Sequence, residues 1–266
     1  MSQLALALSD GAVVAKRNLI KIRRVPEILM WALMSPIMFV VLFAYVFGSS
    51  IEIPGMSYRE FLIAGIFTQT VIFGSTFTGV GLAEDMTKGV IDRFRSLPMT
   101  RSAVLVGRTA SDIVYNSASI LVMTITGLIV GWRVRTSLLE AIGGFLLLLL
   151  FAYAISWIMA YAGLRAGSVE VVNNASFMFI FPMTFVADTF VRSELLPEPL
   201  RTFAQWNPVS SVAQAVREAF GNTGNLPTPD VWPLQNPVLY TIIWVGIILA
   251  IFVPLSTRQY KRAASR

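Results

Sequence analysis

The residues between positions 84 and 95 combine charged and apolar side chains at spacings suited to recognition of another protein. Met86, Val90 and Phe94 recur every fourth residue and so share one face of a helix. Both charge signs surround this apolar ridge, and the expected contact surface comprises Glu84, Asp85, Lys88, Gly89, Asp92, Arg93, Phe94 and Arg95. Such a ridge suits a groove on a soluble partner, although an ordinary solvated loop helix fits the same pattern.

A second set of residues is suited to binding a planar amphiphile. Aromatic rings and one amide recur in two apolar segments: Phe67, Gln69, Phe73 and Phe77 in the first, and Phe177, Phe181 and Phe185 in the second. Rings offer adaptable stacking, and their faces attract cations. These side chains could line a central substrate path. The competing interpretation is that they face lipid or pack between helices.

Covalent catalysis and metal binding have almost no candidate residues. The chain contains no His and no Cys, which excludes disulfides, thiolate or imidazole metal sites, and triads that need an imidazole base. The Gly-x-x-x-x-Gly-Lys-Ser/Thr loop that cradles phosphates is also missing. We therefore predict no catalytic residue, no metal site and no cofactor held by this chain, and nothing in it suggests binding of nucleic acid.

The composition predicts that membrane helices carry both sets of residues. Of the 266 residues, 55% are hydrophobic and only 14% are charged, against about a quarter charged in soluble domains. Six uninterrupted apolar runs have the roughly 20 residues needed to cross a bilayer; they lie at 28–48, 62–83, 110–131, 141–163, 173–191 and 238–257. Because the runs are continuous rather than alternating, the predicted fold class is all-α, a polytopic membrane protein with six transmembrane helices.

Two charged residues fall inside these runs, Asp112 and Asp188. Both lie near the ends of their segments, and we expect Asp112 to pair with Arg108 one turn earlier. Proton- or sodium-coupled transporters place ionisable residues at mid-membrane. None of the six segment centres carries one, which argues against that class of transporter.

The distribution of basic residues predicts the orientation. With the N-terminus in the cytoplasm, the inner segments hold fifteen Lys and Arg residues and the outer segments six. The positive-inside rule then places both termini in the cytoplasm and the protein in the plasma membrane as a multi-pass chain. Residues 84–97 fall on the cytoplasmic side under the same rule.

Two further segments outside the spans have amphipathic helical patterns. Residues 1–24 carry apolar residues at spacings of three and four with basic residues in the final turns, as in a helix lying on the cytoplasmic lipid surface. Within 194–221, Asn207 is a candidate N-cap, Pro208 suits the first turn, and Gly221 suits the end of a helix. That helix could re-enter the outer leaflet and plug a pathway, or only cover the ends of the spans.

Three blocks of sequence carry a resemblance to a known family. They are Lys88-Gly89-Val90-Ile91-Asp92-Arg93-Phe94-Arg95-Ser96-Leu97-Pro98 followed by Gly107-Arg108 and Asp112, then Phe181-Pro182-Met183-Thr184-Phe185, and then Leu200-Arg201-Thr202-Phe203 with Asn207-Pro208-Val209-Ser210 and Val216-Arg217. In these blocks the chain resembles permease subunits of the type-two ATP-binding-cassette (ABC) exporters, and most closely the daunorubicin/doxorubicin-resistance permeases. Asp92 departs from the Glu of many relatives.

The resemblance implies a six-span half-transporter that exports an amphiphilic drug, antibiotic or lipid-like substrate. It implies pairing with a second permease copy or a homologous permease, and with two copies of a separate ABC ATPase that binds ATP and Mg. By the same analogy residues 1–24 are the connecting helix, 84–97 the coupling helix, and 194–221 the re-entrant extracellular helices of a single transmembrane domain spanning 1–266.

Of two other classes of function, one fits the sequence less well than the drug exporter and the other fits it equally well. An intramembrane enzyme would need clustered carboxylates or a nucleophile with its base, and candidates are sparse. A membrane scaffold, or a glycan or lipid exporter component of the same architecture, has no distinguishing sequence feature. A co-purifying protein with a phosphate-binding loop would favour the exporter.

Overall fold

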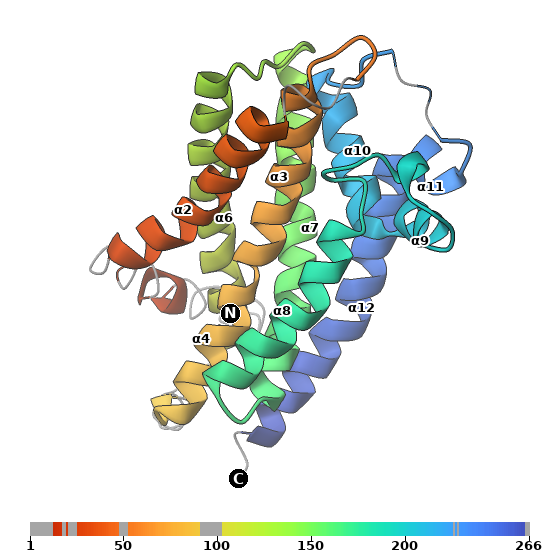
Figure 1. The fold of residues 1–266 in the computed structure, drawn as a ribbon. Coiled ribbons are helices and arrows are strands. Elements are labelled where there is room, and N and C mark those ends of the chain that lie inside the picture. The colour runs from red at the N-terminus through yellow and green to blue at the C-terminus, as the bar shows by residue number, and fades with distance from the viewer. Residues whose placement is uncertain are drawn as a thin grey trace.

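The computed structural model describes residues 13–17, 20, 26–47, 53–90, 103–225, 227 and 229–263. These residues form a bundle of long helices joined by short connections (Figure 1). Within the described ranges the only extended pairing is one isolated bridge between Ile53 and Met56. The prediction of an all-α membrane protein is therefore confirmed.

The helices fall on the six predicted apolar segments. Their bounds are α2 Pro26–Leu42, continued by the π-helix η1 Phe43–Phe47, α3 Tyr58–Gly74, α4 Thr76–Thr87, α6 Ala103–Val130, α7 Leu138–Arg165, α8 Val169–Phe185, and α12 Pro237–Ala263. Among the described residues four stretches are long and apolar enough to cross a bilayer: Tyr58–Thr87, Val104–Val130, Leu138–Arg165 and Pro237–Arg262. Because α2 and α8 have 17 residues each, the count of six spans stays a prediction.

Short helices lie beside the long helices toward one end of the bundle. They are η2 Ser193–Leu195, α9 Leu200–Trp206, α10 Pro208–Phe220 and α11 Trp232–Gln235, and we call this the α10 end (Figure 1). The opposite end, where α4 and α12 finish, is called the α4 end. Asn207 Oδ1 accepts a hydrogen bond from Val209 N at 2.9 Å, Pro208 occupies the first turn, and Gly221 follows α10 with φ +69°. The cap and helix ends expected from the sequence are thus confirmed.

Helices α3 and α4 form the centre of the bundle. In the apolar window of Tyr58–Thr87, 83% of the residues are buried, against 22% in Pro237–Arg262. The α12 helix consequently leaves most of its apolar surface for lipid. Helix α4 approaches α7 closely because Gly79 and Gly163 meet there, where a Cβ on Gly163 would lie 2.3 Å from the Gly79 carbonyl oxygen.

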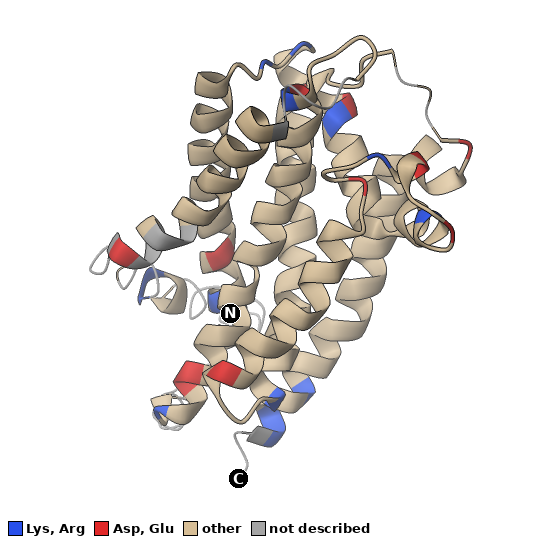
Figure 2. Cartoon of the chain, viewed as in Figure 1, with Lys and Arg blue, Asp and Glu red and all other residues tan. Residues whose placement is uncertain are grey.

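Charged residues are segregated as a membrane protein requires. Figure 2 shows Lys, Arg, Asp and Glu mainly toward the two ends of the bundle, whereas the middle lengths of α7, α8 and α12 carry other residue types. Burying an unpaired charge in hydrocarbon costs several kcal/mol, so this segregation marks the part of the bundle that lies in the bilayer.

Two predicted segments are shorter or less regular than expected. The fifth was placed at 173–191, but α8 ends at Phe185 because side chains satisfy the carbonyls of its last turn. Thr189 Oγ1 donates to Thr184 O at 2.6 Å, and Asn207 Nδ2 donates to Met183 O at 2.7 Å. The second segment breaks at Ser75, whose hydroxyl donates to Val71 O at 2.8 Å and to Ala152 O of α7 at 3.0 Å.

The prediction of one continuous helix over 84–97 is wrong at its start. Helix α4 ends at Thr87, and Lys88 and Gly89 form a turn in which Gly89 has φ +64°, a conformation that glycine adopts without strain. Met86 and Val90 therefore do not belong to one unbroken helical ridge. Asp92, Arg93, Phe94 and Arg95 lie outside the described residues, as does most of the predicted helix 1–24.

Candidate functional site

A cavity of about 360 Å³ lies between α2, the α3–α4 break, α6 and α8. Its volume is in the range of pockets that hold drug-sized molecules. It is lined by Ser35, Pro36, Phe39, Gln69, Thr70, Phe73, Gly74, Thr76, Phe77, Tyr115, Phe177, Phe181 and Phe185. We call it the central cavity. Phe177 is 57% exposed, so the cavity reaches the surface of the chain.

The α8 side of the central cavity is an aromatic wall. Phe177, Phe181 and Phe185 recur every fourth residue, and their rings stack with centroids 4.9 Å and 4.1 Å apart. Across the cavity, the Phe73 ring lies 6.4 Å from Phe177 and the Phe39 ring 6.3 Å from Phe185. The wall presents ring faces and edges to the space between the helices, which suits a flat apolar molecule.

Six of the seven residues predicted for the substrate path line this one cavity: Gln69, Phe73, Phe77, Phe177, Phe181 and Phe185. Phe67 does not. Its ring is fully buried and lies 5.6 Å from Trp132 and 5.8 Å from Phe220. At 100° per residue Phe67 lies about 200° around the helix from Gln69, so the two side chains face opposite sides of α3.

Gln69 and Thr70 form a polar floor of the central cavity, and Asn116 lies outside the lining, behind this floor. Gln69, Thr70 and Asn116 are 6%, 7% and 1% exposed. Within the described part of the chain, neither Thr70 Oγ1 nor Asn116 Oδ1 has a hydrogen-bond partner. Asn116 lies directly behind the lining residue Gly74, because a Cβ on Gly74 would be 2.3 Å from Asn116 Oδ1. An unpaired buried acceptor costs about 1–3 kcal/mol, so this floor is suited to a polar group of a bound molecule.

The expected pairing of Asp112 with Arg108 is not formed. Arg108 Nη2 instead donates to Phe77 O at 2.6 Å, and its guanidinium packs over Gly81, where a Cβ would be 1.7 Å from Nη2. The missing side chain of Gly81 makes room for this arrangement. Asp112 is buried one turn from Asn116, and its Oδ2 has no hydrogen-bond partner among the described residues.

Sequence reasoning missed Thr70, Tyr115 and Asn116. Tyr115 lines the cavity, with its ring 5.0 Å from Phe77. The sequence did mark Asn116, because a carboxamide is unusual inside an apolar run. Which helix Asn116 faces is set by tertiary packing and could not be predicted. No group of three or more His, Cys, Asp and Glu side chains that could hold a metal ion occurs in the described ranges.

The α4 end carries the described part of the predicted contact surface: Glu84, Asp85, Lys88 and Gly89. Lys88 Nζ lies 2.5 Å from Glu84 Oε1, and this hydrogen bond and charge raise the pKa of the lysine. Arg17 Nη2 lies 3.0 Å from Asp85 Oδ2, which joins the described piece of the N-terminal segment to the end of α4. The two segments predicted to face the cytoplasm are therefore in contact.

Comparison with known proteins identifies the family. The ABC-2 type transporter model matches residues 11–220, which include α3, α4, α8 and α10. The chain belongs to the ABC-2 type transporters. This permease is 29% identical to a daunorubicin resistance ABC transporter permease protein of Streptomyces coeruleorubidus, over 97% of the chain and 88% of the relative. It is 22% identical to a doxorubicin resistance ABC transporter permease protein of Mycobacterium tuberculosis, over 72% of the chain and 66% of the relative.

The family assignment separates a permease subunit from an enzyme. The chain is a non-catalytic permease subunit of an ABC transporter, and it is a multi-pass membrane protein. An intramembrane enzyme is thereby excluded. The expectation of a type-two ABC permease is confirmed.

Proposed function

We propose that this permease exports an amphiphilic compound with a flat apolar body and a polar group, such as a drug, an antibiotic or a lipid-like molecule. The observation that carries the proposal is the central cavity, in which the stacked rings of α8 face a floor with unpaired buried acceptors. The stacked rings suit the apolar body, and Gln69 and Thr70 in the lining suit the polar group. The names of two relatives, which refer to daunorubicin and doxorubicin resistance, support a substrate of this kind.

The energy source in this proposal is a separate ABC ATPase in two copies, which bind ATP and Mg. The permease acts as a pair, with a second copy of itself or a homologous permease, in the lipid of the plasma membrane. Residues 84–97 contact the ATPase, and the contact between Arg17 and Asp85 lets residues 1–24 move with them. Both termini face the cytoplasm, so the α10 end faces the exterior, and α9 and α10 re-enter the membrane from outside.

The structure supports a route from this contact to the cavity. Helix α4 runs from Glu84 and Asp85 of the proposed ATPase contact to Thr76 and Phe77 in the cavity lining. Through Ser75, which keeps right-handed helical angles, α4 leads into α3, which supplies Gln69, Thr70 and Phe73. A displacement of α4 can thus change the shape of the cavity.

The substrate proposal is tested by transport into inverted vesicles that contain the permease and its ATPase. A panel of planar aromatic amphiphiles, phospholipids and glycolipids is screened for ATP-dependent uptake. Thr70→Val, which keeps the shape of the side chain, is expected to lower uptake about tenfold, because it removes a buried hydrogen-bonding group worth about 1–3 kcal/mol. Equal uptake by Thr70→Val and the parent for every transported compound would contradict the role of the floor.

The coupling proposal predicts that Phe94→Ala and Asp92→Lys lose transport and substrate-stimulated ATP hydrolysis. Both changes remove groups from the surface proposed to contact the ATPase, one apolar and one charged. Arg165→Lys, at an exposed position at the end of α7 and outside this surface, is the control and should transport like the parent. Membrane insertion, followed by protease protection, should be the same in all variants. Parental transport by both Phe94→Ala and Asp92→Lys would show that residues 84–97 do not couple the two subunits.

A further inference from the structure

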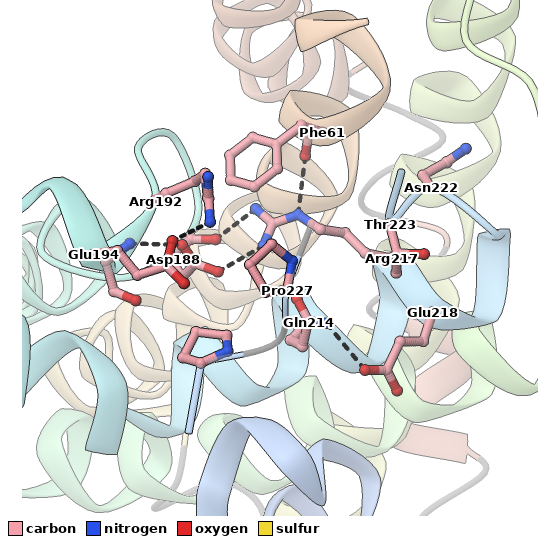
Figure 3. A pocket seen from close by; sticks show the side chains of 12 residues that line it. Phe61, Asp188, Arg192, Glu194, Gln214, Arg217, Glu218, Asn222, Thr223 and Pro227 are labelled. Atoms are coloured by element: carbon pink, nitrogen blue, oxygen red, sulfur yellow. Dashed lines mark hydrogen bonds and ion pairs between the residues drawn. The ribbon is translucent and has the colours of Figure 1, made fainter. Parts of the chain in front are cut away.

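A polar pocket of about 200 Å³ lies at the α10 end, between α3, the segment after α8, and α10. Figure 3 shows the side chain of Arg217 extending from α10 toward Asp188, with the Phe61 ring beside it. The Arg217 side chain is 2% exposed and that of Asp188 9% exposed. This pair differs from a surface ion pair, because two charges taken out of water are retained only where they are fully partnered.

Arg217 joins three elements of the chain. Its Nη1 donates to Asp188 Oδ2 at 3.0 Å, and its Nη2 donates to the backbone oxygens of Asp188 at 2.5 Å and Thr189 at 3.3 Å. Its Nε donates to Phe61 O of α3 at 3.2 Å, and the guanidinium carbon lies 3.6 Å from the Phe61 ring centroid. A planar fork with five donors can make all these contacts, whereas the single ammonium of a lysine cannot.

Asp188 organises the segment that follows α8. Its Oδ1 accepts a hydrogen bond from Ser193 N at 2.9 Å, and its own N–H donates to Ser210 Oγ of α10 at 2.9 Å. Tyr58 of α3 donates its hydroxyl hydrogen to Phe190 O at 3.1 Å. Residues 186–193 are therefore fixed to both α3 and α10 by buried polar contacts.

The segment fixed in this way carries a ring that packs against two residues of the central cavity. Phe190 is buried, and its centroid lies 4.9 Å from Phe185 and 6.4 Å from Phe39, which both line the cavity. It also stacks on Phe43 of η1 at 5.0 Å. Phe190 thus joins α8 to the α2–η1 segment at the edge of the cavity where Phe185 and Phe39 lie.

We propose that Arg217 and Asp188 are positioning residues for transport, which hold Phe190 across the α10 end of the central cavity. Substrate leaves toward that end only when residues 186–193 move away from α3. The closure stands on the contacts above, and its role in export rests on the proposed function. Neither residue touches substrate in this arrangement.

The test uses the absence of cysteine from the chain. Gln69→Cys places one thiol in the cavity floor of the permease, which is expressed with its ATPase. A membrane-impermeant thiol reagent is then applied separately to each side of the membrane. We expect slow modification from the α10 side in the parent, and a rise of about tenfold or more with Asp188→Asn or Arg217→Lys, because loss of one partner of a buried pair is strongly destabilising.

Controls separate this closure from general unfolding. Arg201 lies on the neighbouring helix α9 and forms an exposed ion pair with Glu198 at 3.7 Å, so Arg201→Lys should leave modification unchanged. Modification from the α4 side should be equal in all variants. Should a pair variant fail to accumulate, Phe190→Ala, with the ion pair intact, must raise modification from the α10 side in the same way.

Two results would overturn the proposal. One is a parental modification rate in the pair variants or in Phe190→Ala, and the other is rapid modification from the α10 side in the parent itself. Neither readout needs a transported substrate. Failure of the proposed function would appear in other experiments, as unchanged transport in Thr70→Val and in variants of the aromatic wall.

Discussion

Replacing Phe181 by alanine is expected to raise the substrate concentration for half-maximal transport about thirty-fold, which corresponds to about 2 kcal/mol of binding free energy. Phe181 is the middle ring of the aromatic wall and stacks on both Phe177 and Phe185, at 4.9 Å and 4.1 Å. Its loss removes contact with the substrate and also frees the two remaining rings to turn. The measurement is the initial rate of ATP-dependent uptake into inverted vesicles against substrate concentration.

The chain offers a matched control on the same helix. Met178 is 72% exposed and does not line the central cavity, whereas Phe181 is 36% exposed and does. Met178→Ala should therefore transport with parental kinetics, and Phe181→Leu should lie between the parent and Phe181→Ala because it retains apolar volume without the ring. If Phe181→Ala and Met178→Ala changed the half-maximal substrate concentration equally, the aromatic wall would have no specific contact with substrate. The central cavity would then not be the substrate path.

Local sequence rules predicted those parts of the fold whose ends are set by neighbouring residues. Asn207, Pro208 and Gly221 bound α10 as cap, first turn and left-handed terminus, and each acts within a few residues of its own position. The apolar runs likewise located the helices, because the length needed to cross the bilayer and the cost of burying charge are properties of composition alone.

Helix ends set by tertiary contacts were not predictable in this way. The apolar run continues past Phe185 through Val186 and Ala187, so hydropathy extends the fifth segment to 191. The helix stops earlier because Thr189 and Asn207 satisfy its last carbonyls, and Asn207 comes from another helix cap. The break at Ser75 similarly depends on Ala152 of α7.

The candidate site was predicted only in part, because some of its residues share a local spacing and others meet only through tertiary packing. Spacing of four placed Phe177, Phe181 and Phe185 on one face, and the structure brings them together with Gln69, Phe73 and Phe77. Phe67 could have been excluded by its angle from Gln69 on the helix. Tyr115 and Asn116 of α6 meet α3 and α4 only in the folded chain, and Arg217 meets Asp188 in the same way. These residues are far apart in the sequence, so no local pattern shows that they are neighbours.

Replacing Gly65 by alanine is expected to destabilise the permease by about 3 kcal/mol. A Cβ on Gly65 would lie 2.1 Å from the carbonyl oxygen and 2.8 Å from the Cα of Thr189. Both are backbone atoms of the segment that carries Phe190, and a backbone cannot move aside as a flexible side chain can. The contact is relieved only if residues 186–193 separate from α3, which also weakens the hydrogen bond from Arg217 to Thr189 O.

Gly143 of α7 provides the matched control for this prediction. A Cβ there would meet nothing within 4 Å, so Gly143→Ala is expected to stabilise the helix by about 0.5–1 kcal/mol through the lower backbone entropy of alanine. Thermal unfolding of the purified proteins in one detergent, followed by circular dichroism, gives both signs in one experiment. Equal stabilisation of both variants would show that Thr189 does not cross closely over Gly65. The attachment of the Phe190 segment to α3 would then also be contradicted.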